Sequence, residues 1–144
     1  MAYATQADLE AAFGMKELVM LADRDRNGGP DPAVIDRAVE DAEGEINSYL
    51  ASRYVLPLNP VPAQIRAITC DIARYRMDAA NPRQATKDRY EAALATLRDL
   101  SIGKATLGAS AALAGDPAAN TPPPAMVQGF APESVFSNDK LVGF

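Results

Sequence analysis

The sequence contains no histidine and no tryptophan, and its single cysteine is Cys70. Histidine is the commonest general base and the commonest ligand of transition metals, so histidine-dependent triads and histidine-based zinc sites are excluded. One cysteine cannot form a disulfide within the chain. Because Cys70 falls on the small apolar face of a predicted helix and has no histidine to activate it, we interpret it as a compact core residue and not as a nucleophile.

Strong catalytic motifs are also missing. The chain has no P-loop, no G-x-S-x-G and no C-x-x-C, the short patterns that most directly indicate a reaction. Carboxylate pairs, serine-lysine devices and tyrosines are formally available. An enzyme that hydrolyses its substrate with carboxylates is therefore an alternative, but no feature of the sequence supports it. We predict a protein that is not an enzyme, with no cofactor and no catalytic residues.

Basic residues are fewer than acidic residues. Fourteen basic residues stand against nineteen acidic residues, which gives a net charge of −5. This balance opposes the counterion release that drives tight binding of nucleic acids. No apolar run approaches the roughly 20 residues of a membrane span. We expect neither tight binding of DNA or RNA nor a membrane partner, and the default location is the cytosol.

Aromatic side chains are scarce too, at 6% of the 144 residues, and alanine supplies much of the 48% that are hydrophobic. A core of aliphatic and small residues favours closely packed helices. The length fits one domain with an appendage. We predict an all-α fold, a small bundle of about four to five helices over residues 1–102, with an extended Pro/Gly/Ala-rich C-terminal arm over residues 103–144.

Capping residues and helical periodicity locate the first three helices. Thr5 caps a short helix, with Asp8 in the position of an imperfect capping box, and Gly14 ends it. A second short helix follows at "MKELVMLAD". Asp31 and Pro32 are the N-cap and first residue of a long helix that runs to Arg53. Its apolar stripe predicts one buried face: Ile35, Ala38, Val39, Ala42, Ile46, Tyr49, Leu50 and the stem of Arg53.

The next helix, over "AQIRAITCDIARYRMDAA", follows a proline-rich break and has two apolar faces. One face carries Ile65, Ile68, Ile72, Tyr75 and Ala79, and the other carries Ala63, Ala67, Cys70, Ala73 and Met77. A helix that is apolar on both sides belongs in the middle of a bundle. Asp71 and Arg74 are spaced to pair along its surface. The last helix spans about residues 83–101, and Gly103 ends it.

The predicted arm differs from the rest of the chain. Residues 103–144 contain five Pro, five Gly and nine Ala, a composition that cannot form a core of its own. Its end is nevertheless apolar, and six residues there are candidate partner-binding residues: Phe130, Val135, Phe136, Leu141, Val142 and Phe144. Two alternatives stay open. The arm folds back over an exposed groove of its own bundle, or it docks on another protein.

The loop "DRDRNGGPDPAV" matches the first half of a calcium-binding loop. Four residues are weak candidate ligands: Asp23, Asp25, Asn27 and Asp31. Position 12 requires a bidentate glutamate but is Val34, so we prefer a tight turn, stabilised by Asx hydrogen bonds, that leads into the next helix. A monomeric helical binding module with a weak calcium-responsive loop remains the alternative function.

Four strings resemble a known family when taken in order. They are "YATQADLEAAFG", "LADRDRNGGPDPAVIDRAVEDAEGEINSYLASRYVLPL", "VPAQIRAITCDIARYRM" and "RYEAALATLRDLSIGKATLG". Together they resemble the small neck proteins of Mu-like phages and prophages, over about residues 3–108. The closing "VFSNDKLVGF" also resembles the end of some members.

The resemblance implies a structural virion protein, a head-tail adaptor also called a head completion protein. Such adaptors form a ring, commonly a dodecamer, beneath the portal protein and connect the capsid to the stopper or tail-completion protein. Genomic DNA passes through the ring, which an acidic subunit suits. The implied location is the neck of the virion, after assembly in the host cytoplasm. The long helix from Pro32 to Arg53 is a candidate subunit contact.

Overall fold

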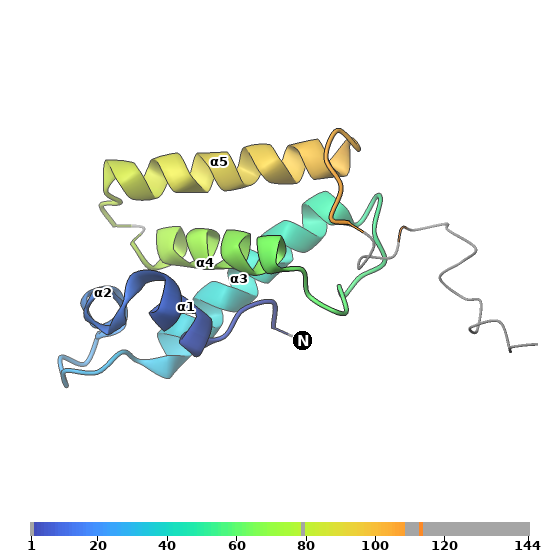
Figure 1. The fold of residues 1–144 in the computed structure, drawn as a ribbon. Coiled ribbons are helices and arrows are strands. Elements are labelled where there is room, and N and C mark those ends of the chain that lie inside the picture. The colour runs from blue at the N-terminus through green and yellow to red at the C-terminus, as the bar shows by residue number, and fades with distance from the viewer. Residues whose placement is uncertain (1, 79, 109–112, 114–144) are drawn as a thin grey trace, which may run out of the picture.

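The computed structural model describes residues 2–78, 80–108 and 113. Within this part of the chain the regular secondary structure is helical, which confirms the predicted all-α class (Figure 1). The helices are α1 (Gln6–Phe13), α2 (Met15–Ala22), α3 (Pro32–Leu50), α4 (Ala63–Met77) and α5 (Gln84–Ser101).

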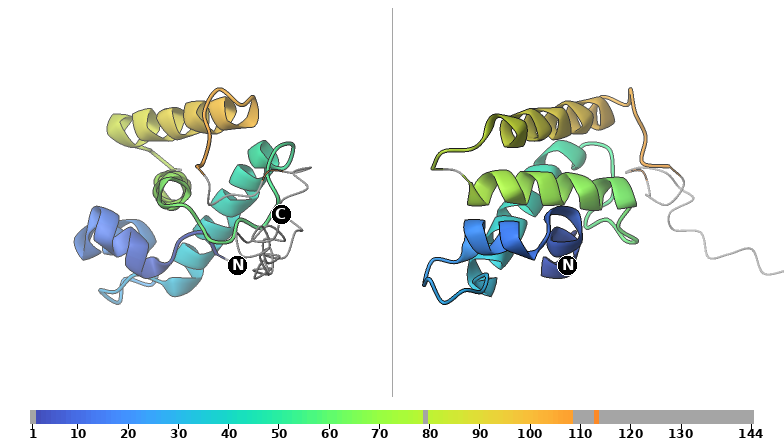
Figure 2. Two further views of the ribbon diagram at one scale, coloured as in Figure 1. Left: turned by 45° about the vertical axis from the view of Figure 1, so that its right-hand side comes forward. Right: turned by 60° about the vertical axis from the view of Figure 1, so that its left-hand side comes forward.

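Helix α4 lies at the centre of the bundle and contacts each of the other four helices. The left view of Figure 2 looks along α4 and shows α5 on one side, α1 and α2 on another and α3 on a third. This confirms the central position predicted from its two apolar faces. The small face is only partly buried, however. Cys70 and Ala73 are buried, whereas Ala63 and Ala67 are exposed to solvent.

The helix starts follow their capping residues as predicted. The Thr5 side chain accepts a hydrogen bond from the Asp8 backbone N–H, and the Asp8 carboxylate accepts one from the Thr5 backbone N–H at 2.8 Å, so the capping box is complete. The Asp31 carboxylate accepts a hydrogen bond from the Ala33 N–H at 2.9 Å. Helix α3 ends at Leu50 and not at Arg53, because the following residues continue as turns toward the proline-rich loop.

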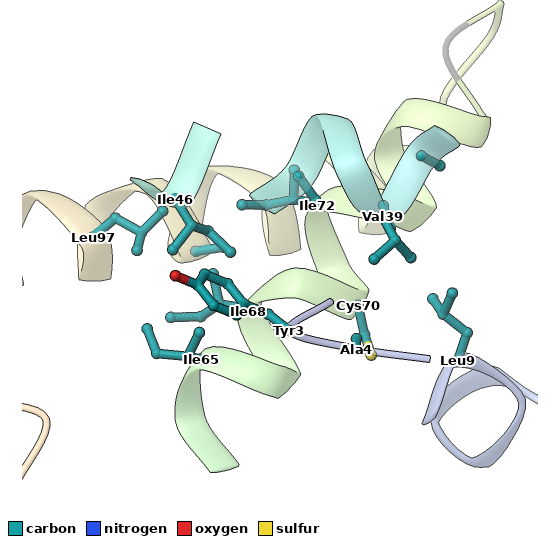
Figure 3. Packing of buried hydrophobic residues seen from close by; sticks show 14 of the residues in the cluster. Tyr3, Ala4, Leu9, Val39, Ile46, Ile65, Ile68, Cys70, Ile72 and Leu97 are labelled. Atoms are coloured by element: carbon teal, nitrogen blue, oxygen red, sulfur yellow. The ribbon is translucent and has the colours of Figure 1, made fainter. Parts of the chain in front are cut away.

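One hydrophobic cluster forms the core, and it includes residues outside the helices (Figure 3). Tyr3, which precedes α1, is 1% exposed, and Leu58, between α3 and α4, is also 1% exposed. The Tyr3 hydroxyl donates a hydrogen bond to Asn47 Oδ1 at 2.6 Å and accepts one from the Leu58 N–H at 3.1 Å. Burial raises the pKa of Tyr3. This hydroxyl therefore attaches both irregular segments to α3.

Packing against the core continues beyond residue 102. Leu107 is 7% exposed, and its backbone N–H donates a hydrogen bond to the buried Tyr54 hydroxyl at 3.3 Å. Leu113 forms an isolated antiparallel bridge with Tyr54. The first residues of the predicted arm thus lie against the loop that connects α3 to α4.

We predict opposite effects for alanine at two glycines. Gly103 has φ +81°, and a Cβ there would lie 1.9 Å from Arg53 Nη1. Gly103→Ala should therefore lower the free energy of unfolding by about 1–2 kcal/mol. Gly44 lies inside α3 with nothing within 4 Å of an added Cβ, so Gly44→Ala should raise it by about 0.5–1 kcal/mol. Urea denaturation measures both, and equal shifts would contradict the backbone assignment.

Candidate functional site

The six candidate partner-binding residues of the arm lie outside the described residues. They are Phe130, Val135, Phe136, Leu141, Val142 and Phe144. Candidate surfaces on the described part of the chain are the loop between α2 and α3, two networks of charged side chains, and the cavities between helices.

The loop before α3 is a turn held by its own side chains. The Asp23 carboxylate accepts hydrogen bonds from the backbone N–H groups of Asn27 and Gly28, both at 3.0 Å. The Asn27 side-chain oxygen accepts one from the Gly29 N–H at 2.9 Å. This confirms the turn interpretation. Val34 packs against the core, so it offers nothing at the position where a calcium loop needs its glutamate.

Three of the four candidate cation ligands, Asp23, Asn27 and Asp31, form hydrogen bonds within the loop or with the start of α3. Asp23 serves the turn and Asp31 caps α3, so both already accept backbone hydrogen bonds. Over residues 2–78, 80–108 and 113, no three acidic or cysteine side chains gather in a group that could hold a metal ion. The geometry of this loop accounts for Asp23, Asn27 and Asp31 through backbone hydrogen bonding.

A charged network joins α2 to α4 and to the segment before α5. Glu17 Oε1 accepts hydrogen bonds from Arg74 and from Arg83. The Arg74 side chain is 13% exposed. Its guanidinium carbon lies 4.7 Å from the centre of the Phe13 ring. The predicted pair between Asp71 and Arg74 is replaced by this network, because Glu17 approaches Arg74 from α2. Asp71 instead pairs with Arg89 of α5 at 3.4 Å.

A second network joins the three longest helices. Glu45 of α3 accepts a hydrogen bond from the Tyr90 hydroxyl and another from the Arg76 guanidinium, both at 2.8 Å. The Tyr90 ring stacks on Tyr75, with ring centroids 4.1 Å apart and 7° between the planes. Burial, followed by the hydrogen bond to Glu45, raises the pKa of Tyr90 to about 12. Both carboxylate oxygens of Glu45 are thus engaged in structural contacts.

The raised pKa of Tyr90 predicts a loss of stability at alkaline pH. Because the folded-state pKa of about 12 exceeds the ordinary tyrosine pKa of 10.0, the stabilisation is fully present below pH 10 and is lost as the pH rises toward 12. Tyr90→Phe removes the ionisable group, so its unfolding midpoint should fall less steeply over this range. Thr96→Ala, which removes a hydroxyl from α5 without altering an ionisable group, is the control and should keep the wild-type slope. Parallel slopes for wild type and Tyr90→Phe would show that the ionisation of Tyr90 does not cause the alkaline loss of stability.

Cys70 is a core residue, as its position on the small face predicts. It is 3% exposed, and Figure 3 shows it projecting from α4 toward Ala4. Burial, with a smaller effect of the neighbouring carboxylates of Asp8 and Asp71, raises the pKa of the Cys70 thiol to about 11. A thiol with this pKa is protonated at neutral pH, which disfavours reaction as a nucleophile.

The exposed part of the small face of α4 forms the floor of a groove. One cavity, of about 370 Å³, lies between α1 and α4. A second, of about 230 Å³, lies between α4 and α5. Both are lined by Ala67, Asp71 and Arg89, so they adjoin each other. We name this surface the alanine groove, after the small residues that line it: Ala11, Ala12, Ala63, Ala67, Ala92 and Ala93.

A larger cavity, of about 560 Å³, lies where the loop before α3 meets the end of α4. Its wall carries arginines and aspartates together, including Arg24, Arg37, Arg76 and Asp41. Arg76 is already paired with Glu45. The mixture of both signs of charge gives this cavity no clear preference for an anion or a cation.

The fold and these surfaces define a small helical protein whose charged side chains connect helices to one another. Arg74, Arg76 and Arg89 each pair with a carboxylate on another helix. Among the described residues, no helix is both long and apolar enough to cross a membrane. The geometry is that of a rigid helical module with an apolar groove on its surface.

Comparison with known proteins identifies the family. The family model described as "Bacteriophage Mu, Gp36" matches residues 3–125. The "Mu-like prophage FluMu protein gp36" of Haemophilus influenzae is 34% identical over 108 residues, which cover 75% of this chain and 77% of the relative. "Gene product J" of Escherichia phage Mu is 31% identical over 118 residues, covering 81% and 84%. The chain belongs to this family of proteins from Mu and Mu-like prophages, which confirms the resemblance noted in the sequence.

Proposed function

We propose that the protein is a structural component of a phage particle, a head-tail adaptor that forms a ring beneath the portal and joins the capsid to the stopper or tail. The observation that carries this proposal is the family match over residues 3–125, together with relatives from phage Mu and a Mu-like prophage. The adaptor role itself comes from the resemblance of the four sequence strings.

The physical properties of the described residues suit a ring subunit. The helices are joined by cross-helix ion pairs, which favours a rigid body that can hold a fixed place in an assembly. Homomeric rings close through head-to-tail interfaces, so one subunit must present two different surfaces. The exposed outer face of α3, with Asp36, Arg37 and Glu40, is a candidate for one of them.

The net charge of −5 supports a passage through which DNA slides without being gripped, because like charges repel. The partners we propose are further copies of the chain, in a ring of twelve, the portal protein, and a stopper or tail-completion protein. Genomic DNA lies near the ring without specific contacts. The proposed location is the neck of the virion, and the function requires neither a cofactor nor catalysis.

Deletion of residues 120–144 tests the proposed role of the arm. The five described helices, α1 to α5, all precede this segment, so we expect the truncated chain to keep its helical circular dichroism but to lose attachment to the purified portal or tail partner. A matched pair of point variants in the full chain refines the test. Phe136→Ser should weaken attachment, whereas Ser137→Ala at the neighbouring position should not. Attachment that survives the deletion, or unfolding of the truncated core, would contradict a docking arm.

A further inference from the structure

The alanine groove is an apolar surface without a partner among the described residues. Its floor on α4 includes Ala67 and its walls come from α1 and α5. Small side chains leave room that larger apolar side chains can fill, and filling it removes apolar surface from water. The cavity between α1 and α4, which is the larger of the two in the groove at about 370 Å³, lies within the range of about 300–1,000 Å³ typical of ligand pockets.

The charges at the rim of the groove indicate what kind of occupant fits. Arg66 lies 3.9 Å from Asp8, and Arg89 lies 3.4 Å from Asp71. Two basic and two acidic side chains give the rim no net charge, so it does not attract a polyanion such as nucleic acid. The groove instead suits a neutral or mixed-charge peptide with large apolar side chains.

The richest source of such side chains in this chain is residues 130–144. Three of the four phenylalanines of the whole chain lie in this segment, together with Val135, Leu141 and Val142. The same fifteen residues carry Glu133, Asp139 and Lys140, so their charge is mixed, like that of the groove rim. The described residues offer no comparable cluster. Their exposed large hydrophobics are Met15, Met20, Val55, Ile102 and Leu113, which come from separate parts of the chain.

The connection between the core and this segment is long enough to reach the groove. Leu113 pairs with Tyr54 in the loop that leads into α4. The residues from 114 to 129 can span up to about 55 Å, at about 3.3–3.6 Å each. A domain of about 100 residues has a radius of gyration of only about 13 Å. A segment tethered by so short a connection has a local concentration in about the millimolar range, so it outcompetes a second copy at micromolar concentration.

We propose that residues 130–144 of the same chain occupy the alanine groove while the protein is unassembled. Their phenylalanine side chains cover the exposed alanines of α4, and a partner takes over these side chains during assembly. The transfer to a partner rests on the proposed function, because the proposed function assigns the same residues to attachment. The occupation of the groove concerns the isolated chain alone, so its test and the attachment test can fail separately.

The absence of tryptophan allows a direct experiment on the full chain. Phe136→Trp introduces a single indole, whose emission should be blue-shifted and whose quenching by acrylamide should be several-fold weaker than that of a free tryptophan derivative. Adding Ala67→Glu places a charge on the groove floor and should restore emission and quenching typical of solvent. Adding Ala33→Glu is the matched control, because Ala33 is an exposed alanine of α3 outside the groove, and it should change neither.

The dependence on protein concentration identifies the occupant. Emission that stays blue-shifted over about a hundredfold dilution supports the segment of the same chain, whereas a blue shift lost on dilution would assign the groove to a second copy and overturn the proposal. Solvent-like emission of Phe136→Trp at every concentration would also overturn it, as would equal effects of the two glutamate substitutions. Circular dichroism checks that each variant is folded, and Ala63→Glu repeats the groove test at a second exposed alanine if Ala67→Glu does not fold.

Discussion

Glu17→Ala is expected to lower the free energy of unfolding by about 3 kcal/mol, the lower end of the range for removing one partner of a buried ion pair. Glu17 is the carboxylate that both Arg74 and Arg83 contact. Its side chain is 19% exposed and that of Arg74 only 13%. Without Glu17, the Arg74 charge remains largely buried, and its Nε already has no hydrogen-bond partner.

Urea denaturation at neutral pH measures this effect. Glu91→Ala is the matched control, because Glu91 is an exposed residue of α5, and its change should stay within about 0.5 kcal/mol. Arg83→Ala should cost less than about 1 kcal/mol, since the Arg83 side chain is 48% exposed and solvent screens its ion pair. Equal costs for Glu17→Ala and Glu91→Ala would show that the network does not hold α2 against α4.

This network also marks a limit of prediction from the sequence. Arg74 lies 57 positions after Glu17 in the sequence, and Arg83 lies 66 positions after it. No local spacing connects these three residues. The spacing of Asp71 and Arg74 does suggest a pair along one helix, since residues three apart are neighbours on its surface. The structure gives each of them a partner on another helix, because tertiary packing brings a competing charge closer.

The helices themselves were predictable because the signals that define them are local. Thr5 and Asp31 cap their helices with hydrogen bonds to nearby backbone N–H groups, and Gly103 ends α5 with a positive φ. The same holds for the loop before α3, where Asp23 and Asn27 accept hydrogen bonds from backbone N–H groups only a few residues further along the chain. Such interactions involve residues close together in the sequence, so they can be predicted without knowing the fold.

The small face of α4 was harder to interpret. Alanine is compatible with burial and with exposure, so the periodicity that correctly places Cys70 in the core cannot show that Ala63 and Ala67 are exposed. Only the positions of α1 and α5 decide which alanines are covered. Thr69, fully buried with its hydroxyl donating a hydrogen bond to the Ile65 carbonyl at 2.7 Å, was missed because polar residues are normally expected outside the core.

The central position of α4 predicts the second large effect, a loss of about 3–4 kcal/mol for Ile72→Ala. Ile72 is 0% exposed and projects from a helix that contacts all four others, so the surrounding side chains have little freedom to close the cavity. Ile102→Ala makes the same chemical change where the side chain is 72% exposed, after the end of α5, and should cost less than about 0.5 kcal/mol. Denaturant midpoints of the two variants compare burial alone, because the atoms removed are identical. A similar loss for both would place Ile72 at the surface of the bundle and would falsify the central position of α4 on which the alanine groove also depends.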